Sequence, residues 1–180
     1  SLLQSANIDA TAQGSNIKEI DEALKSASKK GTGESGFPDF TAKVKDFLIV
    51  IEDKSDLSKH CKLDSNSCID LDNIKSITDY AVNGAIHYAK HLAKNTSFKK
   101  IIAIGVSGDE KHHKISPYFI NERGILDKKL NDLETFTLLN EDNIESYYSQ
   151  EILNITPKEE TTDEEVKQDA EYLHECLRNY

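Results

Sequence analysis

Hydrophobic residues recur with a helical period near the start of the chain. Residues 16–29 place apolar side chains three or four positions apart, at Ile17, Ile20, Leu24 and Ala27. This spacing predicts an amphipathic helix. Asn16 can cap the first turn, and Glu19 completes a start that resembles a capping box. Residues 1–15 are small and polar and have no period, so we expect them to be frayed.

Two strands are predicted after a glycine-containing hinge. Residues 37–44 alternate between apolar and polar positions, which indicates a strand. Residues 46–54 form a continuous apolar run that ends in charge, which is typical of a strand buried on both faces. The short connection at Lys45-Asp46 predicts that the two strands pair as a hairpin.

The remaining chain is predicted to add one long helix, further strands and two helices at the end. The long helix is expected over residues 73–95, where apolar side chains follow the period of a helical face. Further strands are expected at 99–106, 115–120 and 133–139, and further helices at 141–149 and 163–178. The resulting order, α-β-β-α-β-β-β-α-α, favours an α/β (α+β) fold with a mixed β-sheet flanked by helices.

The distribution of charge suggests how the chain is divided. Its 180 residues suffice for one domain with an appendage. The net charge is −10, and residues 141–180 alone contain 12 Asp/Glu against 3 Lys/Arg. We therefore expect a near-neutral core domain over residues 1–140. Residues 141–180 are expected to form an acidic helical extension that connects to a further domain.

Composition indicates where in the cell the protein is located and how it can bind DNA. No apolar run approaches the roughly 18 residues that a bilayer-spanning helix needs, and no secretory signal is visible, so we expect no membrane association. Three cysteines, Cys61, Cys68 and Cys176, are typical of free thiols in the cytoplasm. The only arginines are Arg123 and Arg178, which argues against strong autonomous readout of DNA bases.

Charged residues flank the two predicted hairpin strands at the same end of the sheet. Asp39 lies at the start of the first strand, and Glu52 and Lys54 lie at the end of the second. Because side chains alternate along a strand, Glu52 and Lys54 point to one face and Asp53 to the other. If the strands are antiparallel neighbours, Asp39, Glu52 and Lys54 converge.

Two carboxylates in one small site are costly unless a cation compensates them. Mg²⁺ prefers carboxylate oxygens and bridges readily to phosphate, and Mn²⁺ can substitute for it. Water bound to such an ion becomes a nucleophile, which Lys54 could orient while it stabilises developing negative charge. The chemistry implied is metal-assisted hydrolysis of a phosphodiester. The three charges alone are also compatible with an ordinary solvated strand end.

Four blocks of sequence resemble a PD-(D/E)xK nuclease domain, and more closely the N-terminal cleavage domain of type I and type IIG restriction–modification enzymes. They are SKKGTGESGFPDF at 28–40, FLIVIEDKSDLSKH at 47–60, YAVNGAIHYAKHLA at 80–93 and IIAIGVSG at 101–108. The resemblance implies a restriction-endonuclease-like fold and a Mg²⁺-dependent deoxyribonuclease that acts on double-stranded DNA. It also implies methyltransferase and specificity domains that are covalently linked to the chain or associated with it.

The resemblance also implies roles for individual residues. Asp39 and Glu52 would be metal ligands, Lys54 the catalytic lysine, and the backbone carbonyl of Asp53 a further metal contact. Such domains often add an acid from the first helix, for which we prefer Glu22 over its neighbour Glu19.

One element departs from the family pattern. Many relatives have a Gln-x-x-x-Tyr element on the helix after the core strands. Here Tyr88 is present, but Gly84 stands where the glutamine is expected, which leaves the role of this helix open. Gly84 itself permits close packing or weakens the helix.

Several other polar residues are candidate DNA contacts or solvated side chains: His60, Asn83, His87, Lys111, His112 and Lys114. Ser107 has no evident histidine partner, so we do not expect nucleophilic catalysis by serine. The main alternative to a nuclease is a non-catalytic module that binds DNA or protein and keeps the nuclease fold. A nuclease with another substrate, such as a junction resolvase or an RNA-processing enzyme, is disfavoured by the charge balance.

Overall fold

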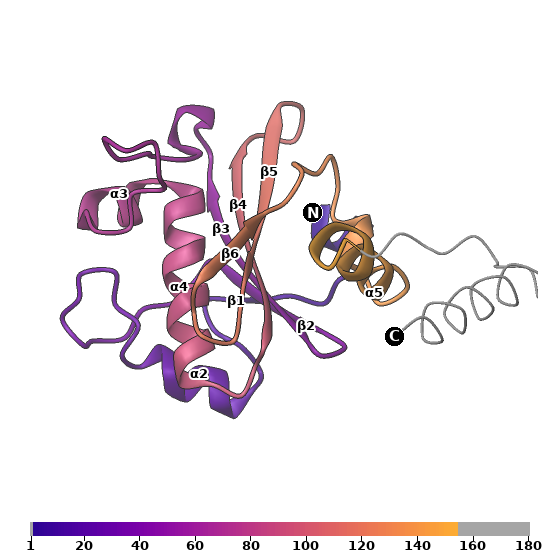
Figure 1. Cartoon of the computed structure of the whole chain (residues 1–180), viewed down its shortest axis with the longest axis horizontal. Coiled ribbons are helices and arrows are strands. Elements are labelled where there is room, and N and C mark those ends of the chain that lie inside the picture. Colours follow the sequence, from indigo (N-terminus) through magenta and orange to yellow (C-terminus); the bar gives the residue numbers. More distant parts are fainter. Residues whose placement is uncertain (1, 155–180) are drawn as a thin grey trace, which may run out of the picture.

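A computed structural model describes residues 2–154 of the chain as a β-sheet with helices on both faces (Figure 1). The elements are α1 (Leu2–Ser5), β1 (Thr11–Ala12), α2 (Lys18–Leu24), β2 (Phe40–Val44), β3 (Phe47–Lys54), α3 (Ile74–Asp79), α4 (Ala81–Asn95), β4 (Lys100–Gly108), β5 (His113–Ile120), β6 (Leu126–Lys129) and α5 (Ile144–Tyr147). Short 3₁₀ turns occupy Leu57–Lys59 and Thr137–Leu139, and a π-helical turn, Tyr148–Ile152, continues α5. The helix predicted at 163–178, and Cys176, lie outside the described residues.

The six strands lie in the sheet in the same order as in the chain. β3 and β4 run parallel, and the other neighbouring pairs run antiparallel. A parallel pair needs a long crossover, which α3 and α4 provide here. The mixed α/β architecture predicted from the sequence is therefore confirmed. No helix among residues 2–154 is long and apolar enough to cross a membrane.

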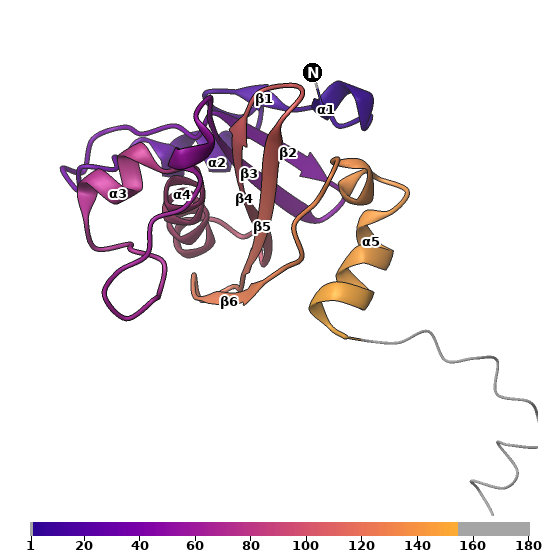
Figure 2. The same cartoon turned by 90° about the horizontal axis from the view of Figure 1, so that it is seen from above.

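Strand β3 divides its side chains between two hydrophobic clusters. Leu48 and Val50 pack with α2 and α4 on one face of the sheet. Phe47, Ile49 and Ile51 pack on the other face, together with α1 and α5. Figure 2 shows these two groups of helices on opposite sides of the sheet. Burial on both faces explains the continuous apolar run from which this strand was predicted.

The predicted hairpin and the close packing of α4 are both present. Val44 pairs with Phe47, so Lys45 and Asp46 form the two-residue turn, in which Lys45 has a φ of +54°. On the next strand, a Cβ at Gly105 would lie 2.6 Å from the backbone nitrogen of Val82. The start of α4 therefore lies directly on β4, which fixes the helix above the ends of β3 and β4.

The predictions for the first two helices need correction. Within the segment predicted to be frayed, residues 2–15 are ordered, because Leu3, Ala6 and Ile8 are buried in the core and the chain forms α1 and β1 there. The helix predicted over 16–29 covers only Lys18–Leu24. Neither predicted capping group acts as one: the Asn16 amide donates to Thr11 Oγ1, and Glu19 accepts hydrogen bonds from Ser97.

The helix predicted over 73–95 is two helices separated by Tyr80, which has extended backbone angles of φ −115° and ψ 135°. The break leaves the backbone N–H of Val82 free to donate to the carbonyl of His60 at 2.9 Å. The loop that follows β3 is thereby attached to the first turn of α4.

The last strand of the sheet lies earlier in the chain than predicted. β6 occupies residues 126–129, whereas residues 133–139 contain one isolated β-bridge and a 3₁₀ turn. The buried residues there are Leu133, Phe136 and Leu139, whose three-residue spacing does not fit a strand.

The hydrophobic core also continues beyond the expected boundary at residue 140. Ile144, Tyr147 and Ile152 belong to the same cluster as α1 and the sheet. The residues from α5 to the π-helical turn are therefore part of the domain and not of a separate extension.

Candidate active site

The hairpin brings three of the predicted site residues to one end of the sheet. Phe40 pairs with Ile51, which sets Asp39, the residue before β2, beside Glu52. One Asp39 oxygen, Oδ2, accepts a hydrogen bond from the backbone N–H of Asp53 at 2.8 Å. Lys54 Nζ lies 3.5 Å from Glu52 Oε2. The expected convergence is present, while the roles of these residues in metal binding and catalysis stay predictions.

Glu52 is a buried carboxylate with one oxygen paired and one unpaired. Only 1% of its side chain is exposed, and Oε2 contacts the ammonium of Lys29 at 2.5 Å in addition to that of Lys54. The other oxygen, Oε1, is buried without any hydrogen-bond partner. Burial raises the pKa of the Glu52 carboxyl, and Lys29 opposes this rise more strongly than Lys54 does. A buried acceptor left unpaired is uncommon in a folded protein and calls for an explanation.

Lys29 was not predicted to belong to the site, and helix α4 accounts for its position. A Cβ at Gly84 would lie 3.0 Å from Glu52 Oε2 and 3.1 Å from Lys29 Nζ, so the ion pair lies directly against this glycine. One turn later, the ring of the buried Tyr88 has its centroid 5.1 Å from Lys29 Nζ. The absence of a side chain at residue 84 thus makes room for Lys29 beside Glu52.

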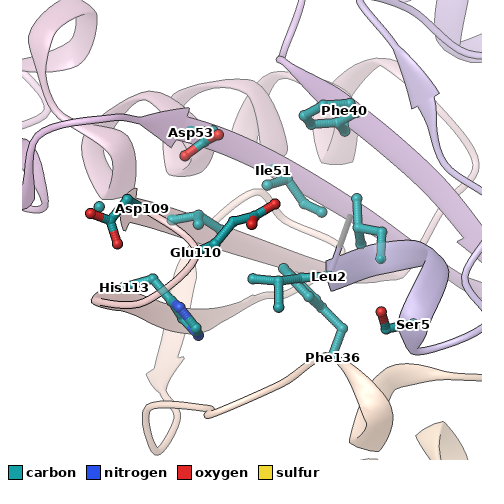
Figure 3. A pocket seen from close by; sticks show the side chains of 12 residues that line it. Leu2, Ser5, Phe40, Ile51, Asp53, Asp109, Glu110, His113 and Phe136 are labelled. Atoms are coloured by element: carbon teal, nitrogen blue, oxygen red, sulfur yellow. The ribbon is translucent and has the colours of Figure 1, made fainter.

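The Asp53 side chain lies on the opposite face of β3, as the alternation of side chains predicts. It lines a pocket of about 590 Å³ with an apolar floor that includes Ile51 and Phe40. Figure 3 shows the carboxylates of Asp53, Asp109 and Glu110 around this pocket. Burial, together with Asp39, raises the pKa of the Asp53 carboxyl. This pocket is therefore separated by the sheet from the Glu52 cluster.

His60 was a candidate DNA contact, but the structure places it in a buried polar network. Its Nδ1 lies 2.8 Å from Ser107 Oγ and its Nε2 lies 2.7 Å from Ser116 Oγ, and Ser116 in turn donates to Asp132. Burial lowers the pKa of His60 to about 4, so the ring is neutral at physiological pH. Both ring nitrogens are engaged.

The prediction that Ser107 has no histidine partner was wrong, since His60 is within hydrogen-bond distance of its hydroxyl. Ser107 is nevertheless fully buried, so a substrate cannot reach that hydroxyl. The hydrogen bond between His60 and Ser107 therefore links the loop after β3 to strand β4, and Ser107 is not positioned as a nucleophile.

Two more of the candidate DNA contacts have structural partners. Asn83 is fully buried, and its amide exchanges hydrogen bonds with the backbone of Lys62 and donates another to the carbonyl of Asp70. Nε2 of the half-buried His87 lies 3.2 Å from the carbonyl oxygen of Ala27. These side chains hold neighbouring loops against α4, and Asn83 has no exposed atom with which to contact DNA.

The loop between β4 and β5 keeps its candidate side chains on the surface. Lys111 and His112 are exposed, and their backbone N–H groups donate to Asp109. Lys114 is also exposed and lies 3.6 Å from Asp132. All three side chains are accessible, and their contact with DNA stays a prediction.

The acids of α2 do not join the Glu52 cluster. Glu22 pairs with Lys25 at 2.7 Å on the exposed side of the helix. Glu19 accepts a hydrogen bond from the Ser97 hydroxyl at 2.9 Å, beyond the far end of α4. Neither carboxylate contacts a residue of the predicted site.

The two acids that remain at the site, Asp39 and Glu52, fit a partly hydrated divalent cation. Among residues 2–154, no group of three or more His, Cys, Asp or Glu side chains could hold a metal ion. Mg²⁺, however, is commonly bound through one or two carboxylates, with water and substrate phosphate completing its shell. Asp39 and the unpaired Glu52 Oε1 provide two such carboxylates, so the residues present fit Mg²⁺ and not an ion that needs a complete protein cage.

Comparison with known proteins identifies a related sequence. Over 170 residues, which are 93% of this chain, the sequence is 41% identical to the type II restriction enzyme and methyltransferase RM.BcgI of Heyndrickxia coagulans. The chain spans 26% of the length of that protein. No family model matches the chain, and no solved structure does.

Proposed function

We propose that this chain, which is related to part of a restriction enzyme and methyltransferase, is a metal-dependent DNA endonuclease domain of the PD-(D/E)xK type. It would hydrolyse phosphodiester bonds of double-stranded DNA as the cleavage module of a type I or type IIG restriction–modification enzyme. Mg²⁺ would be its cofactor. Methyltransferase and specificity domains, linked or associated, would be its partners.

The observation that supports this proposal most directly is the buried, unpaired oxygen Oε1 of Glu52. A buried carboxylate oxygen without a partner costs about 1–3 kcal/mol or more, and a cation bound at Oε1 would offset that cost. Two ammonium groups already contact Oε2, whereas Oε1 contacts none. This arrangement leaves a specific oxygen for a cation, next to a second carboxylate at Asp39.

The residues of the site divide into ion-binding and charge-stabilising groups. Asp39, Glu52 and the Asp53 carbonyl would bind Mg²⁺, which would supply Lewis acidity and a bound water of lowered pKa. Lys54 is the more exposed of the two lysines, at 26% against 15% for Lys29. Its ammonium can therefore donate to a phosphate oxygen or to the attacking water and stabilise the charge that develops during hydrolysis.

The charge of the domain is consistent with a module that depends on its partners for DNA affinity. Residues 2–154 contain 24 acids and 19 bases, so the domain has no excess of positive charge. Because phosphate neutralisation supplies most non-specific affinity, such a domain would bind DNA weakly by itself. Recognition of a DNA sequence would then come from the specificity domain.

Calorimetric titration of the 180-residue chain with Mn²⁺ tests the metal site. We expect one bound ion in the parent protein and a loss of affinity of at least about tenfold in Asp39→Asn and in Glu52→Gln. Glu22→Gln, which removes an exposed carboxylate of α2, provides the matched control and should bind as the parent does. Binding that is absent from the parent, or independent of Asp39 and Glu52, would favour the non-catalytic interaction module.

Cleavage is tested with supercoiled plasmid DNA and the same four proteins. The parent and Glu22→Gln should nick the plasmid when Mg²⁺ or Mn²⁺ is added, and chelation with EDTA should stop the reaction. Nicking by Asp39→Asn or Glu52→Gln at the parental rate would contradict the assignment of the site.

A further inference from the structure

Lys29 is the closest cation to Glu52, and its position depends on three separate contacts. Its Nζ lies 2.5 Å from Glu52 Oε2, against the bare Cα of Gly84 and above the ring of Tyr88. Only 15% of the Lys29 side chain is exposed. The ammonium is therefore enclosed between β3 and α4, where an ion pair is less weakened by solvent than it is at the surface.

The backbone around Lys29 is fixed as well. The N–H of Ser28 donates to the carbonyl of Glu34 at 2.9 Å and closes the glycine-containing loop just before Lys29. The preceding carbonyl, that of Ala27, lies 3.2 Å from His87 Nε2 on α4. Lys29 therefore extends from the anchored base of this loop and not from its exposed tip.

The two lysines contact the same oxygen of Glu52. Lys29 and Lys54 approach Oε2 at 2.5 and 3.5 Å, and neither contacts Oε1. A carboxylate held at one oxygen by a short ion pair has its rotamer and the direction of its other oxygen fixed. Groups that orient a metal ligand in this way commonly contribute about tenfold to a hundredfold to metal affinity.

We propose that Lys29 is a positioning residue, which holds Oε2 of Glu52 against Gly84 and Tyr88 so that Oε1 is the oxygen presented to the divalent cation. This inference rests on the proposed metal site. It assigns to Lys29 a role different from that of Lys54, because Lys29 faces helix α4 and keeps its contact with Oε2 when an ion binds.

Variants of Lys29 test the proposal through metal affinity. Mn²⁺ titration of the 180-residue chain should show Lys29→Met weakened by about tenfold or more, and Lys29→Arg, which keeps the charge, weakened much less. Lys30→Met removes the neighbouring exposed lysine and should bind as the parent does. Lys29→Met that binds Mn²⁺ as tightly as the parent, or more tightly, would overturn the proposal, because Lys29 would then only compete with the ion.

A second measurement needs no destabilising substitution. Side-chain NMR spectra of isotope-labelled protein resolve lysine ammonium groups that are protected from exchange with water, and Lys29→Arg assigns the Lys29 signal by its absence. The signal should persist when Mg²⁺ saturates the parent protein. Its loss on addition of Mg²⁺ would show that Lys29 releases Glu52, and the proposal would be wrong even if Lys29→Met does not fold.

The Mn²⁺ titrations distinguish a wrong role for Lys29 from a wrong assignment of the metal site. If Glu52→Gln loses Mn²⁺ but Lys29→Met does not, the metal site stands and only the role of Lys29 is wrong. If Glu52→Gln binds Mn²⁺ as the parent does, the metal site itself is wrong, and the proposal for Lys29 fails with it.

Discussion

Gly84 and Glu52 are in contact across the interface between α4 and β3, at a spacing in which a side chain at residue 84 would force its neighbours to move. A Cβ there would lie 3.0 Å from Glu52 Oε2 and equally close to the carbonyl oxygen of Ile77. The glycine of the helix and the carboxylate of the strand are therefore a matched pair, and the first prediction follows from it.

Gly84→Ala is expected to lower the metal affinity of the protein while changing its stability little. Alanine in a helix interior stabilises by about 1 kcal/mol relative to glycine, which offsets part of the crowding. The new methyl group would displace the Glu52–Lys29 ion pair, so Mn²⁺ affinity should fall about tenfold while the thermal midpoint moves by only a few degrees. Calorimetry and thermal denaturation measure the two effects, and an unchanged Mn²⁺ affinity would contradict the contact as described.

Lys54→Met is expected to abolish cleavage without abolishing metal binding. Charge stabilisation by one positioned donor is commonly worth about a hundredfold or more in rate, whereas Lys54 makes only a 3.5 Å contact with Glu52. Plasmid nicking should therefore fall by at least that factor, with Mn²⁺ affinity within about threefold of the parent. Lys30→Met, which removes an exposed lysine of the loop after α2, serves as the control for loss of one positive charge. Equal losses in the two variants would assign Lys54 a general electrostatic effect.

Asn83→Ala tests whether this residue stabilises the fold, as its buried position indicates, or contacts DNA, as the sequence predicted. The substitution removes three hydrogen bonds that the fully buried Asn83 side chain makes with the backbone of Lys62 and Asp70, which should lower the free energy of unfolding by about 2–4 kcal/mol. Urea denaturation measures this loss. A variant with parental stability and weakened DNA binding would favour the original expectation.

Substitution of His60 should alter the pH dependence of stability. The folded-state pKa of His60, about 4, lies below its unfolded value of 6.5, so the unfolded chain binds more protons between these values. This histidine therefore stabilises the fold above pH 6.5 and loses that contribution as the pH falls towards 4. The free energy of unfolding should drop by about 1 kcal/mol per pH unit more steeply in the parent than in His60→Gln.

Urea titrations at pH 5.0, 5.5, 6.0 and 6.5 compare these two slopes, with roughly matched ionic strength throughout. His112→Gln removes an exposed histidine and is the matched control. Parallel slopes for the parent and His60→Gln would show that the ring is not held neutral in the folded protein.

The strands that were predicted correctly are those with a strong apolar pattern. Strand β3 was evident from its apolar run because both of its faces are buried, and the period of two placed Glu52 and Lys54 together. By contrast, β6 escaped prediction because Leu126–Lys129 has little apolar pattern, and its position at the edge of the sheet requires none.

Lys29 could not be found from periodicity, because it reaches Glu52 from a loop that belongs to neither element. The only signal was indirect: a buried glutamate required a cation, and a glycine stood where a larger residue was expected. Likewise, the buried positions of His60 and Asn83 depend on how the loop after β3 folds back onto α4. Such long-range contacts leave no local trace in the sequence.

The residues that hold the Glu52–Lys29 ion pair, namely Lys54, Gly84 and Tyr88, come with it from residues 29–88, a single uninterrupted portion of the chain. Bringing these groups together closes loops of moderate length and requires no contribution from the chain after β4, so the entropic cost of assembling them is small. Insertions between β5 and α5 that leave the sheet intact should therefore not change the positions of these side chains.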